Sequence, residues 1–199
     1  MAQLITGRIL SFEHDPFLAG PTAAKIHDAV LVEGGKIVGL GSLAALKAHA
    51  PQAPLTSYGE SLVMAGFVDA HVHFPQTAII ASWGKRLIDW LNDYTFPEEM
   101  RLNDPAYADM IAARYFSLAL SHGTTTLTSF CTIHPASVDA YFEAAAARNM
   151  AVVGGKTCMD RNAPETLQDT AQTAYDDSKT LIDREPADRV GEELDIDVP

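Results

Sequence analysis

From residue 62 onward, the sequence alternates between stretches typical of strands and stretches typical of helices. The stretches typical of strands are rich in apolar and β-branched residues and cover residues 62–73, 124–131 and 150–158. Those typical of helices cover residues 83–94, 104–122, 135–149 and 164–184. Parallel strands need a long crossover between them, and that crossover is usually a helix. The alternation therefore predicts an α/β fold with a parallel sheet, the opening of a (β/α)8 barrel.

The length of the chain limits how much of a barrel it can contain. A complete barrel takes about 250 residues, and each strand–helix unit takes about 30. The chain has 199 residues, and residues 61–182 carry the alternation. That region has room for the first three to four units, so we expect an incomplete (β/α)8 barrel of the TIM type. The chain is then part of a longer protein, a truncated reading frame, or a subunit that a partner chain completes.

Residues 1–60 have a different pattern, which strands dominate. Residues 3–12 alternate between apolar and polar side chains, as a half-buried strand does. Two apolar runs at 29–33 and 36–40 flank Gly34-Gly35, the pattern of a β-hairpin with a two-residue turn. A small β unit is therefore expected before the barrel region.

Composition and charge disfavour several classes of partner. With 14 Lys and Arg against 26 Asp and Glu, the net charge is −12, which disfavours nucleic acid and anionic membrane surfaces. No apolar run reaches the roughly 18 residues of a membrane span, and the first residues lack a signal-peptide pattern. Cys131 and Cys158 lie in apolar stretches and provide no disulfide framework, so we expect buried thiols. These features predict a cytoplasmic protein without nucleic-acid or membrane partners.

The strand pattern at residues 62–73 ends in two histidines, His71 and His73. Side chains alternate between the two faces of a strand, so both imidazoles are expected on one side, and Asp69 has the same parity. Two imidazoles at the end of a strand can bind one metal ion, for which Zn²⁺ is the commonest fit. The active site of a barrel lies at the C-terminal ends of its strands, where this pair is expected. A His-x-His pair also arises by chance, so the pattern by itself leaves a structural role open.

Two longer motifs connect the histidine pair to a known group of enzymes. Gly66-Phe-Val-Asp-Ala-His-Val-His73 resembles the first-strand signature of the amidohydrolase superfamily. The run His71-Val-His-Phe-Pro-Gln76, followed by Trp90-Leu-Asn-Asp-Tyr-Thr-Phe-Pro97, resembles the guanine deaminases. The resemblance extends to about Asp183. It implies that residues 1–60 are the N-terminal part of a β-sandwich, which strands from the far C-terminus of such enzymes complete.

The resemblance also implies a metal site and a reaction. His71 and His73 would be two ligands of one Zn²⁺ ion per site, while a further His, an Asp and the proton-shuttling Glu belong to later strands. The chain would therefore contain no catalytic residue. Metal-bound hydroxide would hydrolyse guanine to xanthine and ammonia, and the full-length enzymes would be homodimers. Lys156 ends the third barrel strand rather than the fourth, where two-metal amidohydrolases carry a bridging carboxylated lysine, and this favours one metal ion.

The residues that follow His73 are expected to form the substrate pocket. By resemblance, Gln76 contacts guanine, because its carboxamide offers a donor and an acceptor to a purine edge; without the resemblance, a loop glutamine that caps a helix is an equally good interpretation. Phe74 and Pro75 would shape the pocket wall. His134 follows the second barrel strand, where a surface loop position is favoured over one that faces the site. Aromatic residues at helical spacing are assigned to the core or a subunit interface: Trp83, Trp90, Tyr94 and Phe96.

Residues 183–199 form an acidic tail with seven acidic and two basic side chains. They lack helical or strand periodicity, so disorder is predicted. A frameshift near residue 182 would explain why the resemblance ends there; an uninterrupted reading frame through Pro199 would refute that hypothesis. Two alternatives stay open for the function. One is another deaminase of the superfamily, acting on 8-oxoguanine or cytosine or of the chlorohydrolase type. The other is a non-catalytic remnant that acts as a binding or dimerising module.

Overall fold

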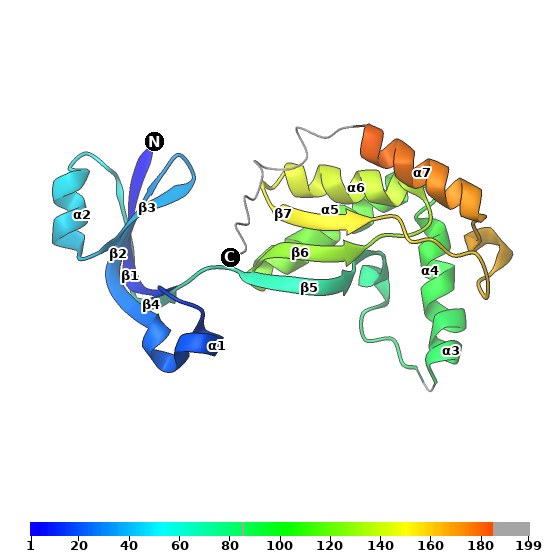
Figure 1. Cartoon of the computed structure of the whole chain (residues 1–199), viewed down its shortest axis with the longest axis horizontal. Coiled ribbons are helices and arrows are strands. Elements are labelled where there is room, and N and C mark those ends of the chain that lie inside the picture. Colours follow the sequence, from blue (N-terminus) through cyan, green and yellow to red (C-terminus); the bar gives the residue numbers. More distant parts are fainter. Residues whose placement is uncertain (85, 185–199) are drawn as a thin grey trace. The chain divides into compact units, whose positions relative to one another are not determined.

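The chain forms two compact units, Met1–Ala65 and a second one from Gly66 onward (Figure 1). The computed structural model describes residues 1–84 and 86–184. Most of the acidic tail predicted for residues 183–199 lies outside the described residues. No helix in these described ranges is long and apolar enough to cross a membrane.

The first unit is a four-stranded sheet with the strand order β3-β2-β1-β4. Its strands are β1 (Ala2–Phe12), β2 (Ala24–Glu33), β3 (Lys36–Gly41) and β4 (Leu55–Val63). The predicted strand and hairpin are confirmed: β2 and β3 pair antiparallel around Gly34 and Gly35, whose φ angles of 58° and 82° suit glycine. Short helical segments connect the strands: α1 (Pro16–Ala19), η1 (Gly20–Ala23) and α2 (Leu43–His49).

The second unit is built on a parallel sheet with the order β5-β6-β7. Its strands are β5 (Phe67–His73), β6 (Thr124–Phe130) and β7 (Ala151–Gly155). The helices α5 (Pro105–Ser121) and α6 (Pro135–Ala146) connect them and cover one face of the sheet (Figure 1). The predicted α/β fold with a parallel sheet is confirmed, and all three strands end at the same edge.

Helix α5 begins and ends where the sequence predicts. The Asp104 carboxylate accepts a hydrogen bond from the Ala106 backbone N–H at 3.0 Å, Pro105 occupies the first helical position, and Gly123 follows the last turn with a φ of 82°. The buried face of the helix carries Ile111 and Phe116, both at most 1% exposed. Together with apolar residues of α6 and β6, these side chains form the core between the helices and the sheet.

Other connecting segments differ from the sequence prediction. Residues 83–94 do not form one helix: α3 (Leu87–Trp90), the π-helical η3 (Leu91–Thr95) and α4 (Phe96–Arg101) follow each other. Leu87 and Ile88 are 72% and 52% exposed. Helix α3 has only four residues, too few to present a continuous buried face.

The end of the described chain shows two further differences. Helix α7 (Ala171–Asp183) begins later than predicted, after the 3-10 turn η4 (Glu165–Leu167). Cys131 is buried, but Cys158 is exposed, against the expectation of two buried thiols. Because β7 ends at Gly155, Cys158 lies in the connection beyond the sheet rather than in a strand.

Candidate metal and substrate site

His71 and His73 lie together at the C-terminal end of β5. Their ring centres are 5.5 Å apart with an angle of 71° between the ring planes. His73 is half-buried and His71 is exposed. The structure thus brings the two imidazoles together, as the alternation of strand side chains predicts.

The geometry of this pair and the protonation of His73 suit a shared metal ion. Imidazoles bound to one tetrahedral zinc at N–Zn distances of about 2 Å have ring centres about 5 Å apart, close to the 5.5 Å observed. Burial, and secondly the neighbouring His71, lower the pKa of His73, which favours the neutral imidazole that binds metals. No group of three His, Cys, Asp or Glu side chains able to hold a metal occurs within residues 1–84 and 86–184. The pair therefore fits two positions of a metal site, and the described residues supply no third.

Asp69 does not extend the polar face of the two histidines. In the pairing of β5 with β6, Asp69 stands opposite Leu127 but Val72 stands opposite Ser129, so β5 carries one extra residue. Such a β-bulge reverses the parity of the strand. Asp69 therefore lines a cavity of about 250 Å³ together with Thr124 and Leu127, and neither histidine of the pair lines that cavity. Its carboxylate also accepts a hydrogen bond from the His71 backbone N–H at 3.2 Å, which braces the bulge.

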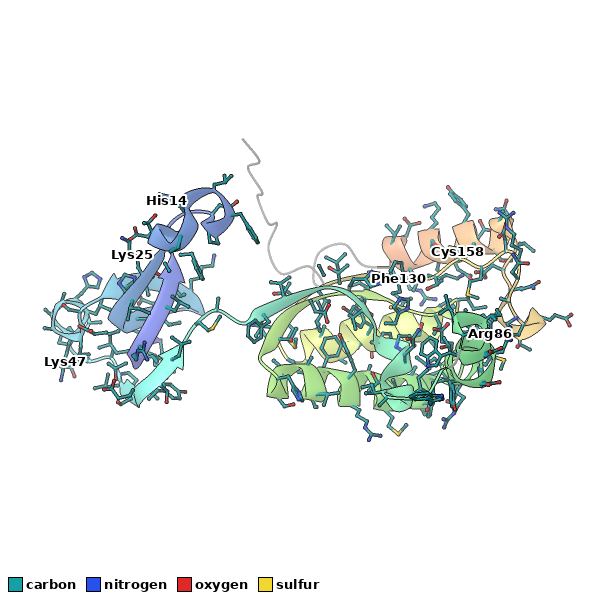
Figure 2. All side chains as sticks on the ribbon, turned by 90° about the horizontal axis from the view of Figure 1, so that it is seen from below. His14, Lys25, Lys47, Arg86, Phe130 and Cys158 are labelled. Atoms are coloured by element: carbon teal, nitrogen blue, oxygen red, sulfur yellow. The ribbon has the colours of Figure 1, made fainter. Side chains whose placement is uncertain are left out.

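Phe130 is part of the site, although no motif in the sequence indicates it. It ends β6 and stands directly opposite His73 in the ladder. Its ring stacks on His73 with centres 5.0 Å apart and meets the edge of His71 at 5.4 Å. The side chain remains 46% exposed (Phe130 is labelled in Figure 2). Phe130 lies at the end of the strand that follows the histidine strand in the sequence. That position is the signal that would have identified it.

A cavity of about 390 Å³ lies beside the histidines, within the size range of small-molecule sites. Gln76 lines it, as expected for a substrate contact, and so does Trp90. The prediction placed Trp90 in the core or at a subunit interface. In the structure, Trp90 is the half-buried last residue of α3, and it lines the cavity. Trp83, assigned to the same class, is 78% exposed, whereas Phe96 is buried as expected.

Phe74 and Pro75 are placed differently from the expectation. Both are buried in the turn η2 (Phe74–Ile79), and neither lines this cavity. Phe74 is fully buried in the core under the sheet, where its ring stacks on Tyr141 at 5.2 Å. The Phe74 backbone N–H donates a hydrogen bond to the Ser129 hydroxyl at 3.1 Å, which fixes the direction of the turn. Phe74 thus anchors the turn η2 in the core.

The Gln76 side chain is held by a buried carboxylate. Its Nε2 donates a hydrogen bond to Oε1 of Glu99 at 3.4 Å. Glu99 belongs to α4 and is only 8% exposed. Burial raises the pKa of Glu99, and the hydrogen bond from Gln76 opposes that effect. Glu99 was not anticipated from the sequence, because a glutamate in a charged helical turn is usually a surface residue.

A second polar cluster follows β6 and β7 at the same edge of the sheet. The Lys156 ammonium pairs with the Asp169 carboxylate at 2.6 Å, and the two side chains are 1% and 7% exposed. His134 lies beside them: burial, and secondly Lys156, lower its pKa. Its Nε2 is buried without a hydrogen-bond partner among the described residues. The Lys156 ammonium is thus engaged with Asp169.

Comparisons with known proteins found a matching family model and several similar enzymes. The model of the "Amidohydrolase family" matches residues 62–195, and that of the "Imidazolonepropionase-like composite domain, bacteria" matches residues 29–53. Guanine deaminase from Escherichia coli is 43% identical over 156 residues, which are 78% of this chain and 36% of that protein. A probable guanine deaminase from Deinococcus radiodurans is 37% identical over 175 residues, 85% of this chain and 40% of that protein.

The fold matches as well. The crystal structure of guanine deaminase from Bradyrhizobium japonicum aligns with a TM-score of 0.88 and 33% identity, over 94% of this chain and 42% of that one. The chain therefore spans about two fifths of the length of the proteins that it matches. The similarity includes both units, because it covers nearly the whole chain.

Proposed function

This chain belongs to the amidohydrolase family, and we propose that it is the N-terminal part of a guanine deaminase, which hydrolyses guanine to xanthine and ammonia. The proposal rests on one observation above all: His71, His73 and Gln76 line a single cavity at the C-terminal edge of the parallel sheet. That edge is where barrel enzymes carry their active sites. The two curated relatives described above, at 43% and 37% identity, are both named as guanine deaminases.

The residues of the cavity have distinct proposed roles. His71 and His73 would hold one zinc ion, which supplies an acidified water for hydrolysis. Phe130 limits the rotation of both imidazoles because its ring touches each of them. Gln76 would hydrogen-bond to the polar edge of the purine, and Trp90 would provide an apolar wall. The proton shuttle and the remaining metal ligands would belong to later strands of the barrel, and residues 1–84 and 86–184 contain no group of three His, Cys, Asp or Glu side chains able to hold a metal.

The incomplete ligand set leads to a separate proposal for the 199-residue chain by itself. A catalytic zinc site usually has three protein ligands, and this cavity offers two. We expect weak zinc binding and no turnover of guanine by this chain alone. The homodimer and the cytoplasmic location expected from the sequence stay predictions.

Two assays test the proposal. The gene product, including any sequence downstream of codon 182, should release ammonia from guanine in preference to 8-oxoguanine, cytosine and chlorinated triazines. Preference for another base would favour a different deaminase of the family, and no release of ammonia from guanine would refute the proposed reaction. For the 199-residue chain, equilibrium dialysis should show zinc binding that His71→Ala and His73→Ala abolish and His49→Ala, at an exposed histidine of the first unit, leaves unchanged.

A further inference from the structure

Glu99 is a buried carboxylate whose hydrogen bond connects it to the candidate substrate site. Its side chain is 8% exposed, and its Oε1 lies 3.4 Å from Nε2 of Gln76. No lysine, arginine or histidine in the described ranges forms an ion pair with it. A buried carboxylate without a cation is costly, so its contact with Gln76 calls for an explanation in terms of function.

The chemistry of the two groups restricts the orientation of Gln76. An ionised carboxylate only accepts hydrogen bonds, whereas a carboxamide has a donating NH₂ group and an accepting oxygen. Glu99 therefore selects the orientation in which the Gln76 NH₂ group faces helix α4. The flipped orientation would place two acceptor oxygens against each other. The Gln76 oxygen then remains available to accept a hydrogen bond from a ligand in the cavity that Gln76 lines.

We propose that Glu99 is a positioning residue that fixes the Gln76 carboxamide, so that the cavity selects purines presenting an N–H donor to Gln76 Oε1. This rests on the proposed function, because it takes Gln76 as a purine contact. The selectivity would come from a pair of side chains on two different elements, η2 and α4, rather than from Gln76 alone. Rotation of the amide by half a turn would exchange donor and acceptor and remove the preference.

The neighbouring Glu98 provides a matched control. It lies in the same helix and is 5% exposed, but it accepts hydrogen bonds from Arg101 at 3.0 Å and from the Tyr107 hydroxyl at 2.5 Å. It makes no hydrogen bond with Gln76 among the contacts of the described residues. Glu98→Gln therefore removes a buried charge from α4 without changing the partner of Gln76.

The first experiment observes the orientation directly and requires no ligand. In the ¹⁵N-labelled chain, the side-chain NH₂ signals of Gln76 are assigned by their loss in Gln76→Ala. One proton should be shifted downfield by its hydrogen bond to the carboxylate. In Glu99→Gln both signals should move towards the values of a free carboxamide, because an amide pair forms in either orientation. Unchanged signals in Glu99→Gln, or an equal change in Glu98→Gln, would overturn the positioning role.

The second experiment measures selectivity as ratios of purine affinities. Guanine is compared with xanthine, in which position 2 changes from a donor to an acceptor and N3 gains a proton, and with 2,6-diaminopurine, in which position 6 changes from an acceptor to a donor and N1 loses its proton. Binding is followed by isothermal titration calorimetry. One of the two ratios should fall about 10-fold in Glu99→Gln, since a mismatched buried polar group costs that much, and Glu98→Gln should leave both unchanged.

A swapped pair supplies the rescue. In the double variant Gln76→Glu with Glu99→Gln, the new glutamine donates to the new glutamate, which again presents an acceptor oxygen to the cavity. The affinity ratio should recover. Ratios that stay the same in Glu99→Gln, or that stay lost in the swapped pair, would overturn the selectivity. If the wild-type chain binds none of these purines, the selectivity fails, while the release of ammonia from guanine by the whole gene product decides the proposed function and the Gln76 signals decide whether Glu99 orients the amide.

Discussion

Replacement of Lys156 by methionine should destabilise the second unit strongly. The Lys156–Asp169 pair is almost completely shielded from water, with side chains 1% and 7% exposed and a separation of 2.6 Å. Removal of the ammonium leaves the Asp169 carboxylate buried and without its cation. Breaking a buried ion pair in this way costs about 3–5 kcal/mol, a large share of the roughly 5–15 kcal/mol that stabilises a typical domain.

The Lys156–Asp169 pair holds a loop in place, and for this reason its loss should destabilise the whole second unit. Asp169 follows η4, and its carboxylate also accepts a hydrogen bond from the Met159 backbone N–H at 3.4 Å. Leu167, at 0% exposure, packs between Phe96 and Ile133 from the segments around the site. Without the ion pair, Asp169 at the far end of this segment loses its tie to Lys156, which directly follows β7.

Urea denaturation followed by tryptophan fluorescence measures this effect, because Trp83 and Trp90 are the two tryptophans of the chain and both lie in the second unit. The matched control is Lys179→Met. Its partner is Asp183 four residues later, and the two side chains are 56% and 58% exposed, so the loss should stay below about 1 kcal/mol. The double variant Lys156→Met with Asp169→Leu should recover much of the stability, since it leaves no buried charge. Equal losses for the two methionine variants would refute the reasoning.

Three further changes test other parts of the structure. Phe130→Ala should weaken zinc binding by the chain several-fold in equilibrium dialysis, because the imidazoles lose the ring that orients them, whereas Phe130→Leu should weaken it less. The folded-state pKa values of His73 and His134 lie below the ordinary 6.5, so the unfolded chain binds more protons, and the urea midpoint should fall as the pH drops below about 6.5. The decline should be shallower in His134→Gln. An identical decline in wild type and His134→Gln would show that burial of this imidazole is irrelevant. Gly154→Ala should cost about 1–3 kcal/mol of unfolding free energy, because the added Cβ would lie 2.7 Å from the Tyr141 ring. A point mutation usually costs about 1 kcal/mol, so a loss below about 0.5 kcal/mol would show that the core adjusts to the added methyl group.

The sequence predicted the elements that local patterns control. Strand alternation, the glycine turn at Gly34-Gly35 and the cap at Asp104 each depend on neighbouring residues, and each was found where expected. The pairing of His71 with His73 likewise follows from the period of a strand. These features require no knowledge of the tertiary structure.

Features that depend on contacts between distant segments were not predictable. Glu99 and Gln76 are 23 residues apart, and Lys156 and Asp169 are 13 apart, on segments whose approach only the fold defines. Phe74 was expected in the pocket because it follows the histidines, yet η2 turns its ring into the core against Tyr141. Cys158 was expected to be buried because its surroundings look like a strand, but β7 ends three residues earlier.

Asp69 shows how one local irregularity changes the chemistry assigned to a strand. A regular β5 would place Asp69, His71 and His73 on one face, and that face would offer three metal ligands. The bulge between Asp69 and Val72 turns the carboxylate towards helix α5. Burial, and secondly the negative charge of Asp69, raise the pKa of Tyr115. A metal ion at the histidines therefore cannot take its third ligand from this strand. A third ligand would have to come from another part of the fold, and the described residues contain no group of three that could hold a metal ion.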